Sequence, residues 1–190
     1  MLEQLLDLDT ELFVYLNGLG TVQWDWLWLI ITNKLTFIPL YAILLFFIYK
    51  TYGWKKTIVI VVFIAGLITF TDQMTNVVKR SVLRFRPCAC DEIMDYIRFI
   101  AERCSTNRSF FSGHASNTMA AAIFGGLMLR SYSKYMIYGL VLWSMIVAYS
   151  RIYVGVHFPV DITCGMAFGA LTGLLFYKLY QKFGQRIVKN

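Results

Sequence analysis

Apolar residues fall in long blocks along the chain, and short polar segments separate them. A helix needs about 20 mostly apolar residues to cross the hydrocarbon core of a membrane. The blocks that approach this length are residues 37–49, 57–78, 115–129, 135–149 and 159–177. The pattern therefore predicts about five membrane-spanning helices. Interruptions at Asn33, Lys34 and Pro39 leave two alternatives for residues 24–49: one long tilted span, or an interfacial piece followed by a short span.

The first twenty residues have a different pattern, in which leucines and one phenylalanine recur near helical spacing with four acidic residues between them. This predicts an amphipathic helix lying at the membrane interface. Its expected role is packing or anchoring rather than chemistry. The fold predicted for residues 1–190 is a single domain, an all-α polytopic membrane helix bundle with this interfacial helix at its start.

Composition supports a membrane protein, because 58% of the residues are hydrophobic and only 15% are charged. Segments 50–56, 130–134 and 178–190 hold nine of the eighteen Lys and Arg residues and none of the Asp or Glu. Short basic segments of this kind face the cytoplasm. We therefore expect the N-terminus, residues 79–111 and residues 151–158 to face the periplasm or exterior of a bacterial inner membrane.

The expected outer loop also holds cysteines and acids. Cys88, Cys90 and Cys104 lie there, where an oxidising compartment permits one disulfide, and Cys164 lies inside the last span. No histidine is near them at zinc-site spacing, and the acidic residues of the loop are scattered. The sequence therefore predicts no metal site and no cofactor.

Polar residues cluster at three points that the predicted topology brings to one membrane face: the end of span two, the start of span three and the link between spans four and five. Taken singly, such residues are ordinary snorkelling cations, helix caps or packed histidines. Together, three fixed positive charges, a helix start and both histidines of the chain indicate an anionic ligand. The clusters are Lys79, Arg86 and Pro87; Ser112, Gly113 and His114; and Ser150, Arg151, His157 and Asp161.

The chemistry that these residues suit is phosphoryl transfer. Lys79, Arg86 and Arg151 supply charge for phosphate oxygens, the arginines as planar forks. Ser112 and Gly113 stand where span three begins, so backbone N–H groups and the positive end of the helix dipole meet the anion. This set neutralises a phosphate without a metal ion.

The two histidines differ in their neighbours. Asp161 lies four positions after His157 and can accept a hydrogen bond from one ring nitrogen. This fixes the tautomer and leaves the other ring nitrogen as a nucleophile. His114 has no such carboxylate and suits an acid that protonates the departing oxygen. Asp72 and Asn76 share a helical face with Lys79, and we interpret them as an orienting or charge-balancing group, with a purely structural pairing as the alternative.

The three clusters resemble the signature motifs of the type 2 phosphatidic acid phosphatase (PAP2) superfamily, membrane lipid phosphatases that share a constellation with vanadium haloperoxidases. One departure is Phe111, where the family usually has proline before Ser-Gly-His. The resemblance implies a metal-independent phosphatase that forms a phosphohistidine at His157, with His114 as acid. The phosphate-holding residues it implies are Lys79, Arg86, Ser112, Gly113 and Arg151.

The predicted function is removal of phosphate from a lipid phosphate or pyrophosphate. The substrate is expected to enter the site laterally from the bilayer. Undecaprenyl pyrophosphate, phosphatidylglycerophosphate and phosphatidate are the candidate substrates, and a lipid A phosphatase is the alternative. A carrier lipid is preferred over lipid A, because 190 residues leave little outer structure to hold a large disaccharide. An anion transporter is the rival from another class, and a haloperoxidase would share the site residues. No nucleic-acid partner is expected.

Overall fold

The computed structural model describes residues 2–104, 108–184 and 187, and this part of the chain is helical without strands. The predicted all-α membrane bundle is confirmed. Short 3₁₀ or π turns join the longer helices: η1 Val22–Trp24, η2 Lys34–Phe37, η3 Pro87–Ala89, η4 Met94–Tyr96, η5 Leu129–Ser131 and η6 Tyr180–Gly184. The longer helices are α1 Leu2–Gly18, α2 Asp25–Thr32, α3 Ile38–Ser81, α4 Gly113–Met128, α5 Met136–Tyr153 and α6 Pro159–Leu179.

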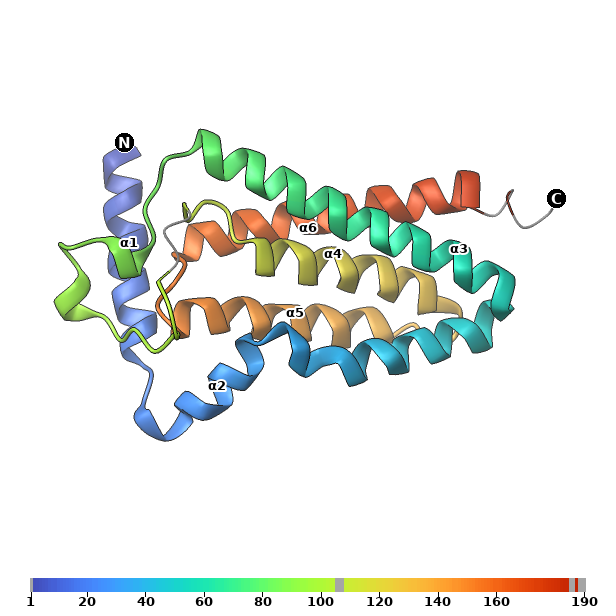
Figure 1. The fold of residues 1–190 in the computed structure, drawn as a ribbon, viewed down its shortest axis with the longest axis horizontal. Helices are drawn as coiled ribbons and strands as arrows, with labels where there is room; N and C mark the ends of the chain where they lie inside the picture. The colour runs from blue at the N-terminus through green and yellow to red at the C-terminus, as the bar shows by residue number, and fades with distance from the viewer. Residues whose placement is uncertain (1, 105–107, 185–186, 188–190) are drawn as a thin grey trace.

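Helix α3 contains the first two predicted spans, folded back on each other at the end of the bundle far from α1 (Figure 1). The reversal occurs at Gly53, whose φ of 73° lies in the left-handed region that glycine adopts without a steric cost. Before α3, the separate helix α2 ends at Thr32, and the Asn33 side chain caps the turn that follows by accepting a hydrogen bond from Leu35 N at 3.0 Å. Of the two alternatives for residues 24–49, the separate piece followed by a span describes the structure.

Helix α4 occupies the centre of the bundle and packs against α3, α5 and α6 (Figure 1). Its contact with α6 is close because three glycines of α6, spaced four residues apart, face the α4 backbone, as small residues do in packed membrane helices. A Cβ atom at any of them would lie closer than 3.0 Å to an α4 carbonyl oxygen. The glycines are Gly165, Gly169 and Gly173, which face Ser112, Ser116 and Ala120. This contact fixes the first turn of α6 against the first turn of α4.

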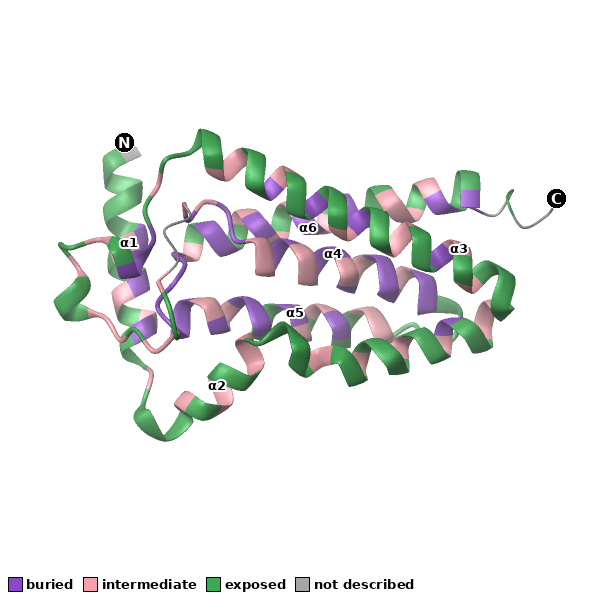
Figure 2. Cartoon of the chain, in the orientation of Figure 1, coloured by how far each residue is buried: buried purple, intermediate pink, exposed green. Residues whose placement is uncertain are grey.

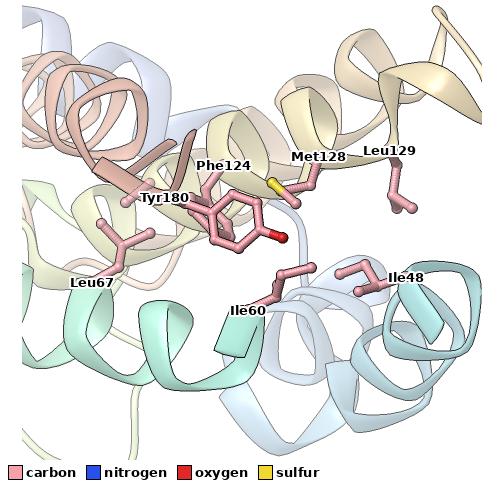
Figure 3. Close-up of a cluster of buried hydrophobic side chains, with 8 residues drawn as sticks. Ile48, Ile60, Leu67, Phe124, Met128, Leu129 and Tyr180 are labelled. Atoms are coloured by element: carbon pink, nitrogen blue, oxygen red, sulfur yellow. The ribbon is translucent and has the colours of Figure 1, made fainter. Parts of the chain in front are cut away.

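Three elements are long and apolar enough to cross a membrane in the described part of the chain: Lys34–Ser81, which contains both arms of α3, Met136–Tyr153 and Pro159–Gly184. The shorter α4 lies at the bundle centre, and nine of its sixteen residues are buried (Figure 2). An apolar cluster from α3, α4, η5 and η6 fills the end of the bundle near Gly53 (Figure 3). It is built by Ile48, Ile60, Leu67, Ala120, Phe124, Met128, Leu129 and Tyr180.

At the opposite end, α1 runs across the bundle and contacts α5, α6 and the loop between α3 and α4 (Figure 1). The residues that α1 buries are Asp9, Phe13 and Asn17, while Leu5 and Leu12 of its apolar set are exposed. The predicted surface helix is present, but two of the three side chains that it buries are polar. Its packing therefore depends on hydrogen bonds as well as on apolar contact.

Candidate active site

His157 is buried in the short link between α5 and α6, and it contacts Asp161 in the first turn of α6. Its Nδ1 atom lies 3.3 Å from Oδ2 of Asp161, and the same oxygen accepts a hydrogen bond from Phe158 N at 3.0 Å. Asp161 therefore reaches back to the start of its own helix, as the acid of a capping box does. Because an ionised carboxylate only accepts, Nδ1 of His157 carries the proton and Nε2 holds the free lone pair.

Burial also sets the charge of this imidazole. Removal from water lowers the pKa of His157 below its ordinary value, and the hydrogen bond and charge of Asp161 oppose this only in part. The positive charges of Arg86 and Arg151 act in the same direction as burial. His157 is therefore neutral at neutral pH, which is the form that can act as a nucleophile.

Two residues that the sequence analysis did not select complete the surroundings of Asp161. Arg84 donates from Nη1 to Oδ1 of Asp161 at 3.0 Å, and Ser109 donates from its hydroxyl to Oδ2. Ser109 Oγ also lies 3.3 Å from Nδ1 of His157. The available signal was weak, since Arg84 stands two positions before Arg86 and Ser109 looks like an ordinary loop residue.

The three predicted phosphate cations gather at this end of the bundle from different elements. Lys79 lies in the last turn of α3, Arg86 follows that helix, and Arg151 lies in the last turn of α5. Lys79 is close enough to both arginines for their charges to interact. Arg151 donates from Nη1 to Thr32 Oγ1 at 2.5 Å, and its buried Nε has no hydrogen-bond partner among the described residues. Mutually repelling cations beside an unused buried donor are an arrangement that suits an anion.

The start of α4 faces the same group. Ser112 is its N-cap, with a hydroxyl that accepts from Ala115 N at 3.4 Å, and its own backbone N donates to the carbonyl oxygen of Asp161 at 3.0 Å. His114 follows in the first turn and interacts electrostatically with Arg151, His157, Lys79 and Lys34. The N-terminus of a helix, two histidines and three cations thus converge, an arrangement suited to phosphoryl transfer.

A family model described as the PAP2 superfamily matches residues 54–185, which include all of these clusters. The chain belongs to the PAP2 superfamily. It is a membrane lipid phosphatase of that superfamily, as the resemblance of its motifs implied, and the anion-transporter alternative has no support.

Relatives from three organisms align with most of this PAP2 chain. The lipid A 4'-phosphatase of Bacteroides thetaiotaomicron is 34% identical over 98% of the chain and 83% of that protein. The lipid A 4'-phosphatase of Porphyromonas gingivalis is 31% identical over 94% of the chain and 75% of that protein. The undecaprenyl-diphosphatase of Sulfolobus acidocaldarius is 26% identical over 91% of the chain and 79% of that protein.

Two solved structures share the PAP2 fold of this chain. A transmembrane PAP2-type phosphatidylglycerolphosphate phosphatase from Bacillus subtilis superposes with a TM-score of 0.73 at 18% identity, covering 95% of this chain and 88% of that one. Aquifex aeolicus LpxE superposes with a TM-score of 0.66 at 21% identity, covering 90% of this chain and 95% of that one. At these identities the likeness concerns the fold alone.

Two further predicted residues lie apart from the PAP2 cluster. Asp72 and Asn76 are on the exposed side of α3, where Asn76 Nδ2 lies 3.4 Å from a carboxylate oxygen of Asp72. The buried side of the helix carries Thr71 and Thr75 instead. The charge of Asp72 interacts with that of Lys79.

A disulfide between Cys88 and Cys104 closes the loop between α3 and α4 on itself, while Cys90 and Cys164 are free thiols. Cys88 packs with Val154 and Val156 of the link that carries His157. The Cys90 thiol donates to the carbonyl oxygen of Arg86 at 3.2 Å. The loop therefore positions Arg86 beside the link that carries His157.

Proposed function

We propose that the chain removes phosphate from a lipid phosphate or pyrophosphate through a covalent phosphohistidine at His157. The observation that carries this proposal is the buried His157–Asp161 pair beside Arg151, whose buried Nε has no partner in the described part of the chain. A neutral imidazole with a fixed tautomer next to an unfilled anion site is what nucleophilic attack on a phosphate requires.

In the first step, Nε2 of His157 attacks phosphorus and the bond from phosphorus to the leaving oxygen breaks. Lys79, Arg86 and Arg151, with the backbone N–H groups at the start of α4, hold the three equatorial oxygens. His114 gives a proton to the departing oxygen, so a lipid alcohol or a lipid monophosphate leaves.

In the second step, water attacks the phosphohistidine and His114 takes a proton from that water. The bond between phosphorus and Nε2 breaks and inorganic phosphate is released. Asp161 keeps the proton of Nδ1 in place through both steps, as the aspartate of a serine-protease triad does for its histidine.

Catalysis should persist in excess EDTA, because three cationic side chains and a helix start neutralise the phosphate charge. The measurement is phosphate release by purified protein in detergent without added divalent metal, across a panel of lipid phosphates and pyrophosphates with glucose 6-phosphate as the soluble control. We expect release from at least one lipid and little from glucose 6-phosphate. Loss of activity on chelation that magnesium restores would contradict the mechanism.

Replacement of His114 by alanine should affect substrates unequally. A lipid alkoxide is a poor leaving group and needs the proton, so its hydrolysis should fall by about 10²–10⁴-fold. An aryl phosphate with an acidic phenol needs the proton less and should lose far less. Phosphate release from both substrates by wild type and by His114→Ala checks this, and equal losses would exclude the general-acid role.

The panel begins with undecaprenyl pyrophosphate, phosphatidylglycerophosphate and phosphatidate. Lipid A 4'-phosphate is the second candidate, and a specific observation favours it: two relatives named as lipid A 4'-phosphatases align with nearly the whole chain. Helices α1 and α2 and the loop between α3 and α4 also gather around the outer end of the bundle. These segments are the ones that a large head group would contact.

We also propose that the site faces the periplasm or exterior of a bacterial inner membrane. The reversal at Gly53, the link between α4 and α5 and the end of α6 lie at the end of the bundle opposite the site, and the basic segments 50–56 and 130–134 are found there. Residues 185–186 and 188–190 of the basic tail lie outside the described residues. The Cys88–Cys104 disulfide supports an oxidising compartment for the loop.

A further inference from the structure

Helix α1 buries a carboxylate against the catalytic end of α6. Asp9 is 4% exposed, and its Oδ1 accepts a hydrogen bond from Val160 N at 2.9 Å. Val160 stands in the first turn of α6, where backbone N–H groups have no partner within the helix. Asp9 therefore caps α6 from another helix, one residue before Asp161.

The other oxygen of Asp9 holds Arg84. Arg84 Nη2 lies 2.6 Å from Oδ2 of Asp9, and Nη1 lies 3.0 Å from Oδ1 of Asp161. The guanidinium plane thus bridges two carboxylates, one from α1 and one from the active site. Lysine, which is a point charge, cannot reproduce this geometry.

Apolar contact reinforces the bridge. The guanidinium of Arg84 lies over the ring of Phe158, 4.0 Å from its centroid, and Phe13 of α1 packs edge-on against the same ring at 5.2 Å. Phe158 directly follows His157 in the chain. Helix α1 therefore contacts the residue after the proposed nucleophile and the residue before its carboxylate partner.

We propose that Asp9 and Arg84 are positioning residues for the nucleophile, so that α1 is part of the catalytic apparatus and not only an interfacial anchor. This inference rests on the proposed role of His157. With Arg84 on Oδ1, Asp161 is held ionised and turned so that Oδ2 meets Nδ1 of His157. Asp9 keeps Arg84 there, because an unpaired arginine near a phosphate site would pair with the substrate instead.

In the proposed mechanism Asp9 and Arg84 do not bind the phosphate, which predicts a specific kinetic signature. Loss of Asp9 or Arg84 should lower kcat by about ten- to a hundredfold, the range known for the hydrogen-bond partners that orient metal-bound histidines. KM and the inhibition constant of inorganic phosphate should stay near the wild-type values. Because the two side chains act through one contact, their effects should not add.

The experiment compares Asp9→Asn, Arg84→Gln and the double variant with wild type, using the full chain in detergent. Asp7→Asn and Arg80→Gln are the matched controls, since Asp7 of α1 and Arg80 of α3 are exposed. We expect the double variant to be no slower than the slower of the two single variants. Arg84→Lys should keep more activity than Arg84→Gln, and both controls should match wild type. Thermal unfolding shows whether each variant is folded.

A second readout does not depend on turnover. The Nδ1 proton of His157, identified by its loss in His157→Asn, should give a proton resonance that shifts in Asp9→Asn and Arg84→Gln but not in the controls. Three results would overturn the inference. They are a folded Asp9→Asn variant with wild-type kcat, losses that add in the double variant, and a resonance that does not shift. If wild type releases no phosphate from any lipid, the proposed function fails, and the resonance alone decides whether Asp9 and Arg84 position His157.

Discussion

Asparagine in place of His157 should lower kcat by a factor on the order of 10⁴–10⁶, the loss seen when a nucleophile is removed from a group of residues that acts as a unit. The asparagine amide can still donate a hydrogen bond to Asp161, so the buried carboxylate keeps a partner and the fold should survive. Phosphate release from the best lipid substrate measures the loss, and thermal unfolding measures the fold.

Binding of inorganic phosphate, measured as protection against thermal unfolding, is the control for His157→Asn. Free phosphate uses Lys79, Arg86 and Arg151, so it should still protect the variant against heat. A folded His157→Asn protein that retained a tenth of wild-type kcat would assign the attack to another group.

Replacement of Arg151 by glutamine should be the next most damaging change, with a loss of kcat/KM of about 10³-fold, the lower end of what a cation on a transferring phosphoryl group contributes. Arg151 approaches the site from α5 with a buried, unpartnered Nε, and it carries charge to oxygens that become more negative in the transition state. Arg151→Lys should fall between glutamine and wild type, because it keeps the charge and loses the planar fork.

Arg130→Gln is the matched control for Arg151→Gln. Arg130 is exposed at the other end of the bundle, so its loss removes the same charge without touching the site. Kinetics on one lipid substrate should show wild-type values for Arg130→Gln. Similar small losses in both variants would show that net charge, and not phosphate binding, explains the effect.

The sequence predicted where the long helices lie and that the motif residues share one end of the bundle, for separate physical reasons. Spans must be apolar over a fixed length, so the blocks at 57–78 and 159–177 nearly match the second arm of α3 and α6. Topology then assigned Lys79, His114 and His157 to one end of the bundle, which is where the structure places them.

The contacts that hold the site together could not be read from local pattern. Asp9, Arg84 and Asp161 are separated by more than seventy residues at each step, and each looks like an ordinary charge in its own segment. Helical periodicity marked α1 as amphipathic, but it favours apolar residues for the buried face and so excluded Asp9. The glycines of α6 were likewise counted as apolar residues of a span, although their spacing sets the α4–α6 contact.

The most direct test of the mechanism is to trap the covalent intermediate. Wild-type protein mixed with a lipid substrate labelled in its phosphate and quenched in alkali, where phosphohistidine survives, should carry label on the peptide that contains His157. The account predicts this label in the presence of EDTA and its absence from His157→Asn. Label that persists in His157→Asn, or rapid turnover with no labelled protein at any quench time, would contradict it.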